Sequence, residues 1–480
     1  MAPDLLDVDL VVIGAGPGGE KGAAQAAYAG KRVALIERSP KPGGAAVNSG
    51  TIPTKALRET ALYFSGLKQR GLYGVDYHVK ADITLPEFMF RERLVVEAQW
   101  AQISENLDKH GITRLQGTAR FVGPGLVEVR RYGEEPRRVR APNVLIATGA
   151  RPHRPSQVPF DDEVIVDADT ILQLTRIPRR LIVVAGEPTG IELAAIFAAL
   201  GSKVTIVSRD ARLVPALDAE VSEVLRAEMT RRLGVSAMLD VEVTSVERAG
   251  DIALVHLADG SVVHGECLLW CGRRTGNSDT LQLEAVGVAP DAHGFIAVDE
   301  HFRTAVPGVY AAGDITGFPA AAATAMEQGR IAMCHAFGLA YKQRLATALP
   351  SVLWTIPEVA MVGETEETLR SRDRAYETGK AYFSRNARGQ ILGDDGFVKL
   401  LFDPDSQRLL GASLVGEGAC ELIHVASTAM SFDGTLDTFI QGVYAYPTLA
   451  EAYKYAAYDG LQRLARRISR RSGLSRQTPS

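Results

Sequence analysis

The residues with the clearest chemical meaning are three glycines near the N-terminus, in the run Gly14-Ala-Gly16-Pro-Gly-Gly19. Gly14 permits a tight turn, Gly16 lets the backbone approach a pyrophosphate, and Gly19 lets a helix pack closely against a strand. Glu37 follows 18 residues after Gly19, near the spacing of a carboxylate that holds a ribose hydroxyl. Together these residues predict a dinucleotide-binding site.

A strand, a helix and a second strand must surround this turn if it is to bind a dinucleotide. The apolar run 9–13 predicts the first strand, the Ala-rich run that ends at Tyr28 predicts the helix, and residues 32–36 predict the second strand. Because the helix begins at the turn, its unpaired N–H groups and the positive end of its dipole face the phosphates. A glycine-rich turn alone is weak evidence, so the order of elements is what makes this motif specific.

A second unit of the same kind begins at residues 181–184, followed by a predicted helix over 191–200 and a strand over 203–207. Ser208 ends that strand, where an NAD-selective site would place a carboxylate, and Arg209 follows it. A neutral residue beside an arginine does not repel a 2′-phosphate, so both NADP and NAD are admissible. The alternative is that Arg209 is an exposed surface arginine.

The glycine pattern of this second unit is altered. Counted back from Gly190, Ala185 occupies the first glycine position and Glu187 the second. Glu187 brings bulk and negative charge to the point where a pyrophosphate should meet bare backbone. Gly186 permits a shifted turn. Two interpretations stay open: a weakened nicotinamide nucleotide site, or a fold that has lost its ligand.

Motifs along nearly the whole chain show that it resembles the class I pyridine nucleotide–disulfide oxidoreductases. Within that family it is most similar to the soluble, Si-specific pyridine nucleotide transhydrogenases. The resemblance rests on these runs: Gly14–Gly19, Gly43-Gly44, Gly50–Arg58, Ala147-Thr-Gly149, Tyr310–Pro319, Met326–Arg330, Thr355–Glu358 and Tyr446–Tyr453.

The resemblance implies that FAD binds to the first unit and NAD(P) to the second, as a substrate. The residues implied for the adenosine half of FAD are Gly14, Gly16, Gly19 and Glu37. Those implied for the remainder of FAD are Gly43, Gly44, Ala46, Thr51, Lys55, Gly149, Gly313 and Asp314. Those expected at the nicotinamide nucleotide are Gly190, Ser208, Arg209 and Gly272. A helix around 322–329 would aim its N-terminus at the flavin and stabilise the reduced ring.

Lys55 and Glu192 match a pair that in this family meets beside the flavin. They are 137 residues apart in the sequence. A structural salt bridge is the plainer interpretation. A buried pair costs desolvation unless it is well hydrogen-bonded, so a role at the flavin is the better account.

The departures from the family pattern are as informative as the matches. Ala46 and Thr51 stand where the disulfide reductases carry a Cys-x4-Cys pair, and neither can shuttle electrons as a thiolate. Tyr446 stands where those enzymes place a histidine that serves the thiols, although Glu451 is retained. A tyrosine is a poor base at neutral pH. Loss of both thiols and their base indicates that disulfide reduction is not the reaction.

The expected fold class is α/β, with two Rossmann-like dinucleotide-binding domains and an α+β C-terminal dimerisation domain. We expect the FAD-binding domain at residues 1–150 and 280–345, the NAD(P)-binding domain at 151–279, and the dimerisation domain at 346–480. Strand-like runs at 398–402 and 409–414 support the last of these. The resemblance implies a homodimer.

Composition excludes several other classes of protein. The 480 residues are 46% hydrophobic and 23% charged, with a net charge of −4, which gives no reason to expect nucleic acid or an acidic membrane surface. With no apolar run of transmembrane length and no signal pattern, we expect a cytoplasmic protein. Cys267 and Cys271 share one face of a predicted strand, as a metal or redox pair or as two core thiols. No metal site is expected.

The sequence therefore predicts a FAD-dependent oxidoreductase that transfers hydride between NADPH and NAD⁺ by ping-pong reduction of the flavin, without a disulfide relay. The nearest alternative is an NAD(P)H:quinone reductase or diaphorase. A third is a flavoprotein with a degenerate nicotinamide site that acts on another organic substrate. A FAD-loaded scaffold or redox sensor is the non-catalytic alternative.

Overall fold

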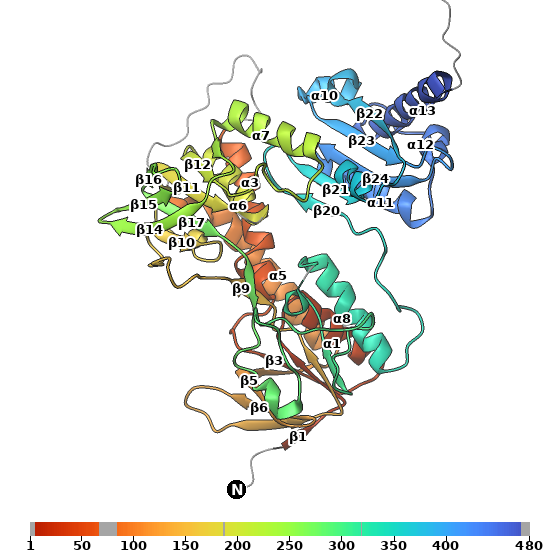
Figure 1. The fold of residues 1–480 in the computed structure, drawn as a ribbon. Coiled ribbons are helices and arrows are strands. Elements are labelled where there is room, and N and C mark those ends of the chain that lie inside the picture. The colour runs from red at the N-terminus through yellow and green to blue at the C-terminus, as the bar shows by residue number, and fades with distance from the viewer. Residues whose placement is uncertain (1–4, 67–83, 186–187, 318, 472–480) are drawn as a thin grey trace, which may run out of the picture. The chain divides into compact units, whose positions relative to one another are not determined.

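The computed structural model describes residues 5–66, 84–185, 188–317 and 319–471. The chain forms two compact units, each built from two segments of the sequence (Figure 1). The first unit comprises Met1–Ile177 and Leu269–Leu345, and the second comprises Pro178–Leu268 and Ala346–Ser480.

The first unit contains most of the N-terminal half of the chain and a returning segment. Its helices are α1 (Pro17–Tyr28), α2 (Gly44–Asn48), α3 (Thr51–Phe64), α4 (Leu85–Phe88), α5 (Phe90–Lys109) and α8 (Ala322–Ala336). Its strands are β1 (Leu5–Asp7), β2 (Leu10–Ile13), β3 (Val33–Glu37), β4 (Thr113–Gln116), β5 (Thr118–Gly123), β6 (Leu126–Arg130), β7 (Arg137–Arg140), β8 (Asn143–Ile146), β9 (Ala150–Pro152), β10 (Ile165–Asp167), β18 (Arg274–Gly276) and β19 (Val309–Ala311). Short 3₁₀ turns lie at Ile171–Gln173, Leu283–Val286 and Asp314–Thr316.

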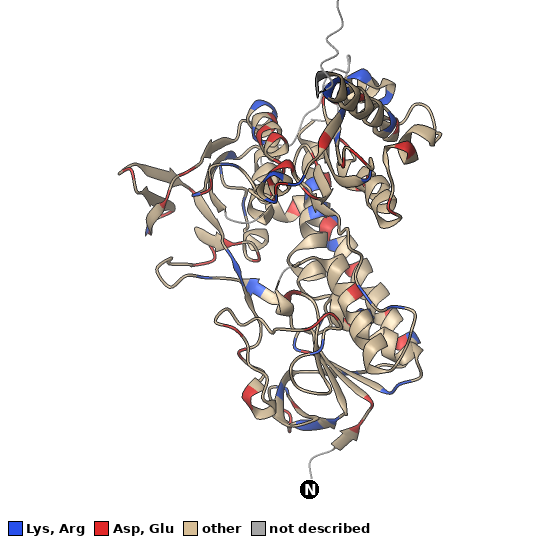
Figure 2. Ribbon diagram, turned by 45° about the vertical axis from the view of Figure 1, so that its right-hand side comes forward, with Lys and Arg blue, Asp and Glu red and all other residues tan. Residues whose placement is uncertain are grey.

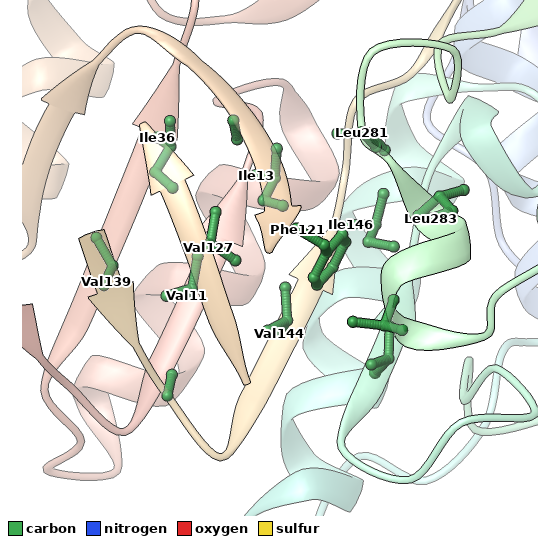
Figure 3. Close-up of a cluster of buried hydrophobic side chains, with 14 of the residues drawn as sticks. Val11, Ile13, Ile36, Phe121, Val127, Val139, Val144, Ile146, Leu281 and Leu283 are labelled. Atoms are coloured by element: carbon green, nitrogen blue, oxygen red, sulfur yellow. The ribbon is translucent and has the colours of Figure 1, made fainter. Parts of the chain in front are cut away.

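A five-stranded parallel sheet in the order β19-β8-β2-β3-β4 forms the centre of the first unit. Alternation along β2 sends successive side chains to opposite faces. Val11 and Ile13 pack toward Phe121, on β5, in a buried cluster that Figure 3 draws in close-up. Leu10 and Val12 pack on the other face, among residues of α1, α5 and α8. Both faces of β2 are therefore covered, as its unbroken apolar run predicts.

The second unit contains the parallel strands β11, β12 and β13, two antiparallel sheets and the C-terminal helix. Its helices are α6 (Pro188–Ala199), α7 (Ala219–Leu233), α9 (Glu366–Ser371), α10 (Ala387–Leu392), α11 (Ala419–Ser431), α12 (Leu436–Gln441) and α13 (Ala452–Arg471), with 3₁₀ turns at Phe383–Arg385 and Leu449–Glu451. Its strands are β11 (Arg180–Ala185), β12 (Lys203–Val207), β13 (Ser236–Met238), β14 (Val243–Ala249), β15 (Ile252–Leu257), β16 (Val262–Gly265), β20 (Ser351–Leu353), β21 (Val359–Gly363), β22 (Glu377–Tyr382), β23 (Phe397–Phe402) and β24 (Leu409–Val415). Strand β17 (Cys267–Cys271) spans the division between the two units.

Three sheets lie in the second unit, one of them the small antiparallel sheet β14-β15-β16. Strands β11, β12 and β13 pair in parallel, with α6 after β11 as a Rossmann unit requires. The C-terminal segment forms an antiparallel sheet in the order β20-β21-β24-β23-β22. The predicted α/β class, with two Rossmann-like parts and an α+β C-terminal part, is confirmed. The three domain boundaries stay a prediction.

The charges and cysteines agree with an ordinary globular protein. Lys and Arg are interspersed with Asp and Glu along both units (Figure 2), in line with the small net charge. Cys267 and Cys271 lie buried in β17, a position that fits core thiols. Among the helices in the described part of the chain, none has both the length and the apolar character needed to cross a bilayer.

A buried lysine joins the two segments of the second unit. The ammonium of Lys399, on β23, lies 3.0 Å from both carboxylate oxygens of Asp218, which precedes α7. It also lies 2.5 Å from Glu366 and 3.2 Å from Glu220. The side chains of Lys399 and Asp218 are 3% and 1% exposed. Lys399 supplies a cation to three converging carboxylates, and Lys380 also pairs with Glu220 while Arg370 pairs with Glu366, so the cluster needs no metal ion.

Mutual bonding fixes the charges of this cluster. Burial alone would lower the pKa of Lys399, but its bonds to Glu366 and Asp218 raise that pKa above its usual value. Burial would likewise raise the pKa of Glu366 and of Glu220, yet their bonds to lysines lower both. Lys399, Glu366 and Glu220 are therefore ionised at neutral pH, and the network ties α7 and α9 to β23.

Replacing Lys399 with methionine should destabilise the protein by about 3 kcal/mol at pH 7.5, because the buried carboxylate of Asp218 is then left without its cation. An unpaired buried carboxyl favours its neutral form. Acidification to pH 5 should then protonate it and recover part of the loss. The free energy of urea unfolding at both pH values measures this difference from the wild type.

Lys203→Met is the matched control, since Lys203 is an exposed lysine at the start of β12. Its effect should stay within about 0.5 kcal/mol at both pH values. Equal stability losses for the two variants, or a loss for Lys399→Met that does not change with pH, would contradict the assignment of a buried ion network.

Candidate functional site

The turn between β2 and α1 has no room for side chains. Gly14 has a φ of +104°, and a Cβ built on it would lie 2.4 Å from the carbonyl oxygen of Ala147. A Cβ on Gly19 would lie 1.9 Å from the carbonyl oxygen of Gly14. Both distances are far inside van der Waals contact, so only glycine permits β2, β8 and α1 to meet here.

A second close approach brings Gly44 against this turn. Gly44 has a φ of +55°, and a Cβ on it would lie 2.8 Å from the Cα atom of Gly16. Gly43, which precedes it, also has positive φ and is buried. Bare backbone therefore faces bare backbone at the start of α1, which is the surface that a pyrophosphate requires.

Five helices of the first unit, namely α1, α2, α3, α5 and α8, begin without a side-chain cap. Gly16 precedes α1, Gly50 precedes α3 and Ala321 precedes α8, and none supplies a side-chain hydrogen bond to its helix. The first N–H groups of each helix are then left for water or a ligand, with the positive end of the helix dipole behind them. The predicted start of a helix at Ala322 is confirmed.

Glu37 ends β3 and is held by the backbone. Its Oε2 accepts a 2.7 Å hydrogen bond from the N–H of Ala15, and its Oε1 accepts a 2.8 Å bond from the N–H of Ser39. These bonds orient the carboxylate beside the glycine turn. A carboxylate has about four acceptor positions, so positions remain for the predicted ribose hydroxyl.

The segment that would carry two cysteines forms the end of one helix and the start of another. Ala46 lies half-buried within α2, and Thr51 is the exposed first residue of α3. Lys55 follows one turn later, half-buried, with its Nζ 3.3 Å from the hydroxyl of Thr54. The segment therefore forms a short turn between two helices, and neither of the two expected positions carries a thiol.

Gly313 and Asp314 lie where β19 leads toward α8. The N–H of Gly313 donates to Gln328 over 2.7 Å. Burial raises the pKa of Asp314, against the opposing effect of Arg274, whose Nε lies 3.9 Å away. Gly149, with a φ of +69°, accepts a hydrogen bond from the N–H of Asn277.

Two buried polar atoms of this region test whether it can hold a cofactor. The hydroxyl of Thr148 and the Nε of Arg274 have no hydrogen-bond partner within the described ranges of the chain. Buried polar groups are normally satisfied, so both atoms point to a missing polar ligand. Together with the Gly16–Gly44 surface, they fit an extended dinucleotide such as FAD.

The predicted nucleotide site in the second unit is only partly described. Gly186 and Glu187 lie outside the described residues, so the altered turn stays a prediction. Gly190 is buried in α6. Ser208 is buried, with its hydroxyl accepting a 3.2 Å hydrogen bond from the N–H of Asp210, whereas Arg209 is exposed. The hydroxyl of Ser208 also donates to the carboxylate of Asp210 over 3.5 Å, so the roles of Ser208 and Arg209 at a nucleotide stay a prediction.

Glu192 lies on α6 and is 6% exposed. Its Oε1 accepts a 2.7 Å hydrogen bond from the backbone N–H of Trp354, 162 residues away. Lys55 belongs to the first unit and Glu192 to the second, so the predicted pair stays a prediction. The bond to Trp354 fixes the position of the Glu192 carboxylate within its own unit.

The two remaining predicted residues lie near the C-terminus. The side chain of Tyr446 is 73% exposed. Glu451 accepts a 3.3 Å hydrogen bond from the amide of Asn386, which also donates to the carbonyl of Thr448. Gly272 follows β17 and is half-buried. The structure thus places Glu451 in a fixed loop and leaves Tyr446 open to a partner.

Sequence reasoning missed the polar residues that line the first site from the returning segment. Arg274 and Asn277 lie in no motif quoted above, because each acts through a contact more than one hundred residues away. Gln328 lies within the Met326–Arg330 run, but its bond to the N–H of Gly313 was not predicted. The signal in the sequence that could have identified Arg274 and Asn277 is the polar run directly after β17. In that run only Gly272 was predicted as a site residue.

Gly44→Ala should weaken retention of the dinucleotide at least about tenfold, because the new Cβ meets the Gly16 backbone. Gly30→Ala is the matched control, with a φ of +76° but open space around its Cβ. Both variants carry the strain of positive φ, about 1–2 kcal/mol, but only Gly44→Ala blocks the site. Dissociation constants for FAD measure the difference. Equal losses of affinity in both variants would show that the close approach of Gly44 to Gly16 is not part of the FAD site.

Comparison with known proteins agrees with this geometry. The profile of the pyridine nucleotide-disulphide oxidoreductases matches residues 8–329, and that of their dimerisation domain matches residues 349–457. The soluble pyridine nucleotide transhydrogenase of Mycobacterium bovis (strain BCG / Pasteur 1173P2) is 40% identical over 460 residues, 95% of this chain and 98% of that protein. The soluble pyridine nucleotide transhydrogenase of Colwellia psychrerythraea is 34% identical over 462 residues, 95% of this chain and 99% of that protein.

Solved structures show the same fold over nearly the whole chain. The crystal structure of LpdA from Mycobacterium tuberculosis matches with a TM-score of 0.86 and 30% identity, covering 94% of this chain and 99% of LpdA. The flavoprotein disulfide reductase RclA from Escherichia coli, in its Cu(II) complex, matches with a TM-score of 0.84 and 25% identity, covering 94% and 99%. The chain therefore belongs to the pyridine nucleotide-disulphide oxidoreductase family, and it is an oxidoreductase that uses FAD and NAD(P).

Proposed function

We propose that this oxidoreductase transfers hydride between NADPH and NAD⁺, as a soluble pyridine nucleotide transhydrogenase. Two observations together carry the proposal. The backbone surface at Gly16 and Gly44, called the cradle below, fits a dinucleotide, and the loop between α2 and α3 carries neither of the two thiols of a disulfide reductase. Ala46 and Thr51 cannot store electrons, so electrons must pass directly from the flavin to an incoming acceptor. The names of relatives at 34–40% identity support a nicotinamide nucleotide as that acceptor.

FAD, when bound, supplies the chemistry by accepting a hydride and giving it to a second molecule. The chain positions it. Gly16 and Gly44 present bare backbone to the pyrophosphate, and the carboxylate of Glu37 lies ready for a ribose hydroxyl. The N-terminus of α8 contributes positive potential at the flavin. Lys55 is proposed to set the local charge beside the reactive ring.

The second unit is proposed to bind the nicotinamide nucleotides in turn at one site. Ser208 and Arg209 would accept the 2′-phosphate of NADPH without repelling NAD⁺. The Trp354 N–H holds Glu192 in place, which supports a fixed carboxylate for the proposed pairing with Lys55. Because one site serves both nucleotides, the kinetics should be ping-pong.

A homodimer in the cytoplasm is proposed as the working form. The match to the dimerisation domain supports the dimer. Several apolar side chains of the second unit are exposed in the single chain, among them Phe432, Val443 and Tyr446. Tyr446 and Glu451 would then serve the nucleotide site of the assembly in place of a thiol base.

The acceptor can be identified by two successive additions to the flavin-loaded protein. NADPH under anaerobic conditions should bleach the flavin, and NAD⁺ should then restore the oxidised spectrum at the rate of turnover. Recovery with a quinone but not with NAD⁺ would make the protein a quinone reductase instead. If NADPH does not bleach the flavin, the protein is instead a FAD-loaded scaffold or redox sensor.

Steady-state rates with NADPH and an NAD analogue test the single shared site. Double-reciprocal lines should run parallel, because one product must leave before the second nucleotide enters. Intersecting lines would reject this order of events.

Arg209→Ala should weaken the binding of NADPH about tenfold, since a charge-assisted bond to the 2′-phosphate is lost. Binding of NADH should change less than twofold, because NADH lacks that phosphate. Arg179→Ala, at another exposed arginine of the same unit, is the control and should leave both affinities unchanged. Equal weakening of NADPH and NADH by Arg209→Ala would remove this residue from the site.

A further inference from the structure

The side-chain amide of Asn48 bridges the turn that leads into α2. Asn48 is the last residue of this helix, and its Nδ2 donates to the carbonyl of Gly44 over 2.8 Å and to that of Pro42 over 3.2 Å. The residue between them, Gly43, donates its N–H to the carbonyl of Ala15 over 2.8 Å. One amide therefore holds the turn on both sides of the point where it bonds to the glycine turn after β2.

A tryptophan on α5 fixes the direction of this amide. The indole N–H of Trp100 donates to the Oδ1 of Asn48 over 2.9 Å. Because an indole nitrogen can only donate, it selects the amide oxygen and turns the NH₂ group toward the two carbonyls. The ammonium of Lys41, which directly precedes the turn, lies 4.7 Å from the centre of the Trp100 ring as a cation–π contact. Three hydrogen bonds thus hold the exposed Asn48 side chain in one orientation.

Helix α5 is itself bonded to α1, so it supports the turn from a fixed position. Asn106, farther along α5, donates over 2.6 Å to the Oε1 of Glu20, which is buried in α1. Trp100 also packs against the buried cluster that contains Leu10 and Val12 of β2. Helix α5 therefore holds both α1 and the turn before α2, the two elements whose backbones form the cradle.

The backbone of the turn shows why it needs this support. Gly43 has a φ of +105° and Gly44 a φ of +55°. Glycine adopts many conformations when no bond selects one of them. Helix α2 has five residues, and a helix this short is not stable by its own hydrogen bonds. Without the amide of Asn48, the turn would lose the bonds that hold Gly44 beside Gly16.

We propose that Asn48, oriented by Trp100, is a positioning residue of the FAD site that keeps Gly44 against the backbone of Gly16 and so stabilises bound FAD. The inference rests on FAD binding at the cradle and not on the identity of the electron acceptor. Neither Asn48 nor Trp100 was among the residues that the sequence predicted for the site.

The test is the dissociation constant of FAD, measured from the flavin fluorescence that is released on dilution of the holoenzyme. Asn48→Ala removes both bonds to the turn, and it should raise that constant about tenfold over the wild type. Asn48→Asp still accepts from Trp100 but has no N–H group for the carbonyls, so it should weaken FAD binding at least as much. Trp100→Phe keeps an aromatic ring and removes the N–H group, with an expected rise of about threefold.

Phosphorus NMR of the holoenzyme separates positioning from a general loss of stability. The pyrophosphate resonances of bound FAD should move in Asn48→Ala and Asn48→Asp, because the backbone beside the phosphates shifts. A role confined to folding would lower the free energy of urea unfolding and leave these resonances in place. Gln102→Ala is the control, since Gln102 is an exposed amide on α5 that accepts a hydrogen bond from Gln99. It should change neither the dissociation constant nor the resonances.

An unchanged dissociation constant in Asn48→Ala and Asn48→Asp would overturn the inference. So would weaker binding with unmoved phosphorus resonances, or a loss of affinity that Gln102→Ala reproduces. Should neither Asn48 variant fold, Trp100→Phe decides alone by the same two measurements. A wild-type protein that binds no FAD would instead refute the proposed cofactor site, so the two failures are distinguishable.

Discussion

The meeting of bare backbones around Gly14 is the constraint on which the rest of the first unit depends. The carbonyl oxygens of Ala147 and Gly14 lie where Cβ atoms of Gly14 and Gly19 would stand. This contact lets α1 begin directly at the carboxyl end of β2, with its free N–H groups pointing outward. Gly44 approaches from the other side and closes the cradle. The cofactor site is thus made chiefly of main chain, and side chains only tune it.

The chain has this backbone cradle but lacks the two cysteines that the disulfide reductases of the family carry. Ala46, Thr51 and Tyr446 replace the residues that would store electrons in a disulfide and move its protons. The loop itself lies between the end of α2 and the start of α3 in the described structure. Keeping the loop while losing its thiols is what direct discharge of a flavin to a diffusing nucleotide would require.

The local pattern of apolar residues and glycines was enough to predict helices and strands. It did not predict the contacts between segments that are distant in the sequence. The strand–turn–helix around Gly14 and the start of α8 follow from apolar periodicity and glycine positions. Asp218, which binds Lys399, and Trp354, which binds Glu192, each lie more than 150 residues from their partner, and tertiary packing alone brings them together. Glu37 was predicted to face a ribose, and its bonds to two backbone N–H groups could not be foreseen from spacing.

The number of hydrides that the protein accepts tests the central claim most directly. Anaerobic titration of the flavin-loaded protein with NADPH should reduce it completely with one equivalent per chain, because the flavin is its only two-electron store. Uptake of a second equivalent, accompanied by the appearance of two new reactive thiols, would reveal a disulfide relay and contradict the account.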